Sequence, residues 1–216
     1  MNLAFLLFLS FMPAVSVAVL CVRRGEYDAS RALRCLAFGL AAVLPAALIQ
    51  FVLASRSMYL SGAGGLLFRS FAVAALVEES LKFAAVFFVA RRGAARAADR
   101  FVLLSGLTAA LSFAAFESLV YALRSPGSVF VRFLTAVVLH AASGIVAGAF
   151  VLERSRSAER LAGARFFLAA VGLHGLYNTF AVLGFPLVAL SFAVLVAFVF
   201  FAWSQWSRRA AVGPRA

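Results

Sequence analysis

Apolar residues fill seven stretches of the chain, each long enough to cross roughly 30 Å of hydrocarbon. The stretches lie at about 2–22, 35–54, 70–90, 101–123, 133–152, 163–183 and 185–203. Each one predicts a membrane-spanning helix, because a helix satisfies its own backbone polar groups inside lipid. We therefore predict an all-α fold, a polytopic transmembrane bundle of about seven helices that forms one integral membrane domain over residues 1–216.

The composition also places this chain in lipid. Hydrophobic residues make up 65% of it, and its mean hydropathy of +1.03 excludes a soluble domain. A net charge of +12 can signal nucleic-acid binding, but here the basic residues stand in small groups at the ends of the apolar stretches. Membrane topology and anionic headgroups explain the charge better, so we expect the bilayer as a partner and no nucleic acid.

The arginines predict the orientation, because cytoplasmic loops retain positive charge. Three groups follow the first, third and fifth stretches: Arg23, Arg24, Arg31 and Arg34; Arg91, Arg92, Arg96 and Arg100; Arg154, Arg156, Arg160 and Arg165. The other loops are poorer in arginine and include the glycine-containing segment 55–69, predicted to be a long connection. We expect the N-terminus outside and the C-terminus, with Arg208, Arg209 and Arg215, in the cytoplasm.

Ionisable and amide side chains interrupt four of the apolar stretches. They are Glu78, Glu79 and Lys82; Glu117; His140; and His174 with Asn178. The set holds three of the eight acidic residues, both histidines and the only lysine. Counting along each predicted helix places them at a common level, roughly 8 to 14 Å from the outer surface. Charged groups inside a membrane are costly and usually face one another around a functional site.

Helical spacing gives these groups common faces. Residues four apart lie on one side of a helix, which pairs Glu78 with Lys82, and His174 with Asn178. Glu117 shares its face with Phe113 in the same way. On the stretch at 133–152, His140 stands in a row with three small residues on the same side: Ala136, Gly144 and Gly148. Small residues let a neighbouring helix approach closely, so this row predicts a packing seam.

The residue types suit hydrolysis inside a membrane, which needs a base for water and donors for an oxyanion. Glu78 or Glu117 can serve as the base, and His174 and Asn178 can supply the donors. We expect no cofactor. Zinc stays an open alternative, with Glu78, His140 and His174 as ligands. The absence of a His-Glu-x-x-His segment and the position of Lys82 beside the carboxylates speak against the metal.

Four short motifs occur in a fixed order on successive predicted helices. Residues 78–82 read E-E-x-x-K, 113–117 F-x-x-x-E, 140–144 H-x-x-x-G and 174–178 H-x-x-x-N. Together they resemble the PrsW family of intramembrane proteases, which is grouped with the CAAX prenyl endopeptidases and the Aph scaffold subunit of gamma-secretase. The resemblance covers a motif-bearing core at 70–183. Ser118 departs from it, since many PrsW relatives have Asn there.

The resemblance implies a glutamate-dependent peptidase that cuts membrane-anchored proteins, such as anti-sigma factors, near their extracytoplasmic side. It further implies a multi-pass protein of the cell membrane, in bacteria the inner membrane. Glu78 would activate water with help from Glu79, and His174 and Asn178 would stabilise the oxyanion. The implied catalytic set is Glu78, Glu79, Glu117, His140, His174 and Asn178, with Lys82 in support. Glu117 is either a second base or a structural carboxylate.

Other interpretations of the same residues stay open. Glu79 and Lys82 can form a purely structural ion pair. Tyr121 and Tyr177 are predicted to be lipid-facing or interfacial packing residues rather than site residues. For the whole protein, one alternative is a non-catalytic scaffold resembling the Aph subunit. A proton-coupled carrier is the other, because carriers also bury carboxylates and histidines.

Overall fold

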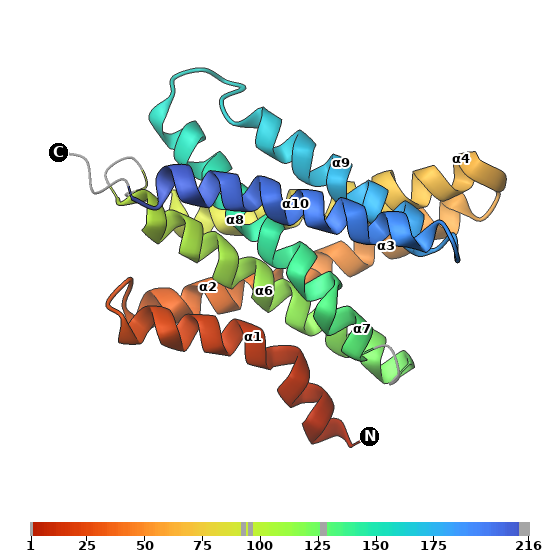
Figure 1. The fold of residues 1–216 in the computed structure, drawn as a ribbon, viewed down its shortest axis with the longest axis horizontal. Helices are drawn as coiled ribbons and strands as arrows, with labels where there is room; N and C mark the ends of the chain where they lie inside the picture. The colour runs from red at the N-terminus through yellow and green to blue at the C-terminus, as the bar shows by residue number, and fades with distance from the viewer. Residues whose placement is uncertain (1, 92–93, 95–96, 126–128, 212–216) are drawn as a thin grey trace.

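The computed structural model describes residues 2–91, 94, 97–125 and 129–211, and within them every regular element is a helix (Figure 1). The elements are α1 (Leu3–Arg23), α2 (Ala29–Ala41), α3 (Val43–Ser57), α4 (Gly62–Leu67), the π-helix η1 (Phe68–Leu76), α5 (Val77–Ala90), α6 (Asp99–Arg124), α7 (Val129–Leu134), α8 (Ala136–Arg156), α9 (Ala164–Ala181) and α10 (Val188–Arg209). Arg92, Arg96 and Arg215, used above to predict orientation, lie outside the described residues.

The predicted all-α, multi-pass bundle is confirmed. Within the described residues, five helical segments are long and apolar enough to cross a membrane: Leu3–Arg23, Ala29–Ser57, Asp99–Arg124, Phe130–Arg156 and Val188–Arg209. The other two predicted spans are helical as well, as η1 with α5 and as α9. These two carry most of the polar cluster, which lowers their hydropathy. Which end of the bundle faces outward stays a prediction.

The segment 55–69 is not the long loop that its glycines predicted. α3 continues to Ser57, α4 begins at Gly62, and η1 runs from Phe68 into α5 without a break. Within this segment only Gly62 has a positive φ, of 63°, so the turn needs a single glycine there. As a result Arg69 lies in a helix and not in a loop.

The centre of the bundle is the contact between α6 and α8, where three glycines bring the backbones together. A Cβ on Gly144 would lie 2.6 Å from the carbonyl oxygen of Gly106, and one on Gly148 would lie 2.9 Å from the Cα of Leu103. The predicted small-residue seam is therefore present, and His140 lies one turn before Gly144 on it. Close packing here fixes the position of α8 relative to α6.

Gly144→Val is expected to destabilise the bundle by about 1 to 3 kcal/mol, because its side chain has no space between α6 and α8. Gly172→Ala in α9 is the matched control, since a Cβ at Gly172 meets nothing within 4 Å. Thermal unfolding in detergent micelles should show a lower Tm for the first variant only. Equal Tm values for both variants would contradict the close contact at the seam.

Candidate active site

Glu79 and Lys82 form the buried centre of the polar cluster. Their side chains are 0% and 1% exposed, and Lys82 Nζ donates to Glu79 Oε1 over 2.6 Å. The same ammonium group lies 2.8 Å from His140 Nδ1 on α8. Because an ammonium group only donates, His140 Nδ1 accepts this hydrogen bond. Lys82 therefore pairs with a buried carboxylate on its own helix, α5, and connects α5 to α8 by its hydrogen bond to the His140 imidazole.

Glu79 has two more partners on two other helices. His174 Nδ1, on α9, lies 2.7 Å from Glu79 Oε1, and the Ser143 hydroxyl of α8 donates to Oε2. An ionised carboxylate only accepts hydrogen bonds. His174 therefore donates to Glu79 from Nδ1. Ser143 is a partner that the sequence analysis missed. Its position three residues after His140, on the same side of the helix, is the signal that was available.

His140 connects the buried centre to a second carboxylate, that of Glu117 on α6. His140 Nε2 lies 2.7 Å from Glu117 Oε2, and its ring contacts Phe113 with centroids 5.7 Å apart. The guanidinium of Arg132, on α7, lies 3.0 Å from Glu117 Oε1 and 3.9 Å from the centroid of the Tyr121 ring. Arg132 was assigned to a loop in the sequence analysis, and its contact with Glu117 was not foreseen.

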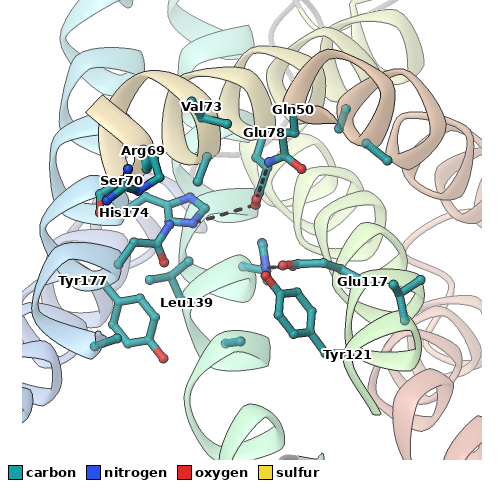
Figure 2. Close-up of a pocket in the computed structure, with 18 of the residues that line it drawn as sticks. Gln50, Arg69, Ser70, Val73, Glu78, Glu117, Tyr121, Leu139, His174 and Tyr177 are labelled. Atoms are coloured by element: carbon teal, nitrogen blue, oxygen red, sulfur yellow. Dashed lines mark hydrogen bonds and ion pairs between the residues drawn. The ribbon is translucent and has the colours of Figure 1, made fainter. Parts of the chain in front are cut away.

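Glu78 differs from Glu79 in having an oxygen that makes no hydrogen bond. Gln50 Nε2, on α3, donates to Glu78 Oε1 over 3.0 Å, whereas Oε2 has no hydrogen-bond partner in the described part of the chain. The groups nearest to Oε2 are His174 Nε2 at 3.7 Å and Lys82 Nζ at 4.0 Å. Figure 2 shows Glu78 between Gln50 and His174. Gln50 is neutral, so the pattern of ionisable residues in the sequence did not predict its contact with Glu78.

These groups border a cavity of about 870 Å³ between α3, η1, α6, α8 and α9. Glu78, Glu117, His140, His174 and Asn178 line it, but Glu79 and Lys82 do not. Asn178 is half-buried, and the described residues offer its amide no hydrogen bond. The predicted site residues thus separate into a face that reaches the cavity and a pair buried behind it.

Tyr121 and Tyr177 also line this cavity (Figure 2). Tyr121 is nevertheless 46% exposed and Tyr177 is partly buried, so each ring also keeps an outer surface, and their predicted role as packing residues stays a prediction. Each phenol brings a hydroxyl group, which can donate and accept, to a wall that is otherwise mostly apolar. The cavity combines apolar walls with a few polar groups, as ligand sites in proteins do.

A family model described as PrsW family intramembrane metalloprotease matches residues 29–204. The chain belongs to the PrsW family. The comparisons with curated proteins and with solved structures gave no match. Membership places the chain in a family of intramembrane proteases, and with the apolar helices it makes this a multi-pass membrane protein. The match spans all four motifs, from the first glutamate at 78 to the asparagine at 178.

The description of the PrsW family implies a metal, and the cavity holds groups that fit one. Glu78, Glu117 and His140 each offer an atom, and these atoms lie within 4.8 Å of one another. This trio differs from the predicted one in having Glu117 in place of His174. His174 still lies beside it, with Nε2 at 3.7 Å from Glu78 and Nδ1 bonded to Glu79. A carboxylate on the far nitrogen of the ring is typical of zinc-bound histidines.

Proposed function

We propose that this PrsW-family protein is an endopeptidase that hydrolyses membrane-anchored proteins, with Glu78 as the base that activates water. The substrates we propose are single-span regulators of the anti-sigma-factor type, in a bacterial inner membrane. The observation that carries the assignment of the base is that Glu78 lines the cavity and that its buried Oε2 makes no hydrogen bond in the described residues. Its partner oxygen is held by Gln50, so the carboxylate has a fixed orientation.

The hydrogen-bond network supports different roles for the two histidines in this proposal. Lys82 donates to Nδ1 of His140, so the ring proton of His140 lies on Nε2 and is donated to Glu117. His174 donates from Nδ1 to Glu79, which leaves its Nε2 as an acceptor toward Glu78 and the cavity. A neutral His174 is thus suited to orient a water molecule. It becomes an oxyanion donor only when both nitrogens are protonated.

The proton steps then follow from these positions. Glu78 takes a proton from a water molecule that His174 Nε2 orients, and the resulting hydroxide adds to the carbonyl carbon of the peptide bond. The amide group of Asn178 donates to the oxyanion, because it lines the cavity one turn beyond His174 and has N–H groups to give. Glu78 finally gives its proton to the leaving nitrogen. Glu79 and Lys82 touch no substrate and act as positioning residues.

A divalent metal held by Glu78, Glu117 and His140 would, when bound, polarise the carbonyl and acidify its own water. Glu117 is a metal ligand in the metal-dependent form of the proposal, and it has no such role in the metal-independent form. Elemental analysis of the purified protein, wild type against Glu117→Gln, separates them by a readout other than activity. Loss of one bound equivalent in the variant supports the metal. Full turnover by wild-type protein in a strong chelator supports the carboxylate acting alone.

Quantitative proteomics of host membranes tests the function itself. Cells with the wild-type protein are compared with cells that express Glu78→Gln at the same level. A single-span protein that is shortened only with the wild type supports the peptidase and names its substrate. Identical membrane proteomes, with the variant inserted and folded, contradict the peptidase and favour a scaffold.

A further inference from the structure

At one end of the bundle, the charged residues outside the polar cluster are all arginines. The described residues of 55–76, 118–125, 129–135 and 180–187 lie at this end, and none of them is Asp or Glu. They carry four arginines: Arg56, Arg69, Arg124 and Arg132. The five acidic residues outside the polar cluster belong to the other end of the helices: Glu26, Asp28, Asp99, Glu153 and Glu159. A polypeptide that enters from the cationic end therefore meets a positive potential.

Three of these arginines line the cavity, and only Arg56 does not. Arg132 pairs with Glu117 through Nη2, 3.0 Å from Oε1, and its Nε makes no hydrogen bond in the described residues. Arg69 donates to the Leu60 carbonyl over 3.1 Å. Within the described chain, neither Arg69 nor Arg124 has a carboxylate partner. The rim of the cavity thus has the capacity to bind acidic side chains.

Helix geometry sets the distance between this rim and the reacting groups. Arg124 follows Glu117 by two turns on the same face of α6, which is about 10 Å along the helix axis. An extended peptide covers about 3.3 Å per residue, so about three residues span this distance. Between these two positions Val120 and Tyr121 line the cavity, and their largely apolar side chains suit the end of a substrate's own membrane helix.

We propose that the cavity selects substrates with an acidic side chain about three residues from the cleaved bond, on the side that leads out past Arg124. This inference rests on the proposed peptidase function and deepens it. Arg124 and Arg69 bind the carboxylate directly, since a guanidinium matches a carboxylate in charge and geometry. Arg132 adds its positive charge while it keeps Glu117 in place.

Synthetic single-span peptides test this selectivity. Each carries one Asp, Asn or Lys at one of about six positions just beyond an apolar helix, and mass spectrometry maps the cleaved bond. At the selected position, wild-type protein should cleave the Asp peptide about fivefold faster than the Asn peptide. About 0.5 M salt should remove the difference. Arg124→Glu should prefer the Lys peptide, whereas Arg56→Glu, at the same end but off the cavity, should keep the wild-type order.

A capture experiment separates failure of this inference from failure of the peptidase. Photo-cross-linking of the same peptides to Glu78→Gln measures binding without turnover. Preferential capture of the Asp peptide supports the inference, even if the wild type cleaves none of the peptides, a result that would count against the peptidase alone. Equal capture of the Asp, Asn and Lys peptides overturns the inference, whatever the rate of cleavage.

Discussion

Glu78→Gln is expected to abolish cleavage and to leave the fold intact. The amide keeps an oxygen for the hydrogen bond from Gln50, and its new NH₂ group occupies the position of an oxygen that made no hydrogen bond. Stability should therefore change little. An amide takes no proton from water at neutral pH, so turnover should fall by about 10² to 10⁴-fold, the usual contribution of a general base.

The control for this variant is Glu153→Gln, which removes a partly exposed carboxylate that pairs with Arg165 and Arg209 near the end of α8. It should retain wild-type turnover. Cleavage per folded molecule and thermal unfolding are measured for both variants in the same detergent. A Glu78→Gln protein that cleaves as fast as the Glu153→Gln protein would remove Glu78 from the role of base.

Glu79→Gln is expected to have the second large effect, on stability. Glu79 is fully buried and accepts from Lys82, His174 and Ser143, whereas an amide has one oxygen to offer. The substitution turns an NH₂ group toward donors among Lys82, His174 and Ser143. It also leaves the buried charge of Lys82 without its counterion. Breaking a buried pair in this way costs about 3 to 5 kcal/mol.

Thermal unfolding measures this cost, again with Glu153→Gln as the control. The surface pair that Glu153 forms should contribute about 1 kcal/mol or less. We expect the Tm of Glu79→Gln to fall far below that of Glu78→Gln, although the two glutamates are adjacent in sequence. Similar Tm values for the two variants would contradict the division into a cavity face and a buried pair.

The ionisable part of the cluster was predictable because membranes make such residues costly. Glu78, Glu117, His140 and His174 had to face something other than lipid, and counting turns from the helix ends gave them one level. In the structure their side chains lie within hydrogen-bonding or ion-pair distance of one another or of Lys82 and Glu79. The roles that the resemblance implied for each residue remain predictions.

The partners of the cluster were not predictable in the same way. Gln50 and Ser143 are neutral, and such residues are common in membrane helices without any special contact. Whether they reach the cluster depends on how α3 and α8 are rotated, which residue spacing alone does not fix. Arg132 and Tyr121 were interpreted as boundary residues for the same reason. The contacts of Arg132 with Glu117 and with the Tyr121 ring depend on the short α7 packing against α6.

Residue spacing did not predict which three residues could hold a metal, because it does not fix how a histidine ring is oriented. The sequence suggested Glu78, His140 and His174, since two histidines and one carboxylate form a familiar zinc site. In the fold, Glu117 lies between Arg132 and His140 and offers an oxygen within 4.8 Å of ligand atoms of Glu78 and His140. His174 turns one nitrogen to Glu79, a contact between α9 and α5 that no motif encodes.

The most direct test of the central claim is the single-turnover cleavage rate of a purified, reconstituted substrate, compared between wild-type protein and Glu78→Gln at equal folded concentration. The account predicts a rate at least about 10²-fold lower for Glu78→Gln, with wild-type stability. A rate within a few-fold of wild type would contradict it, because the carboxylate of Glu78 would then not be the base.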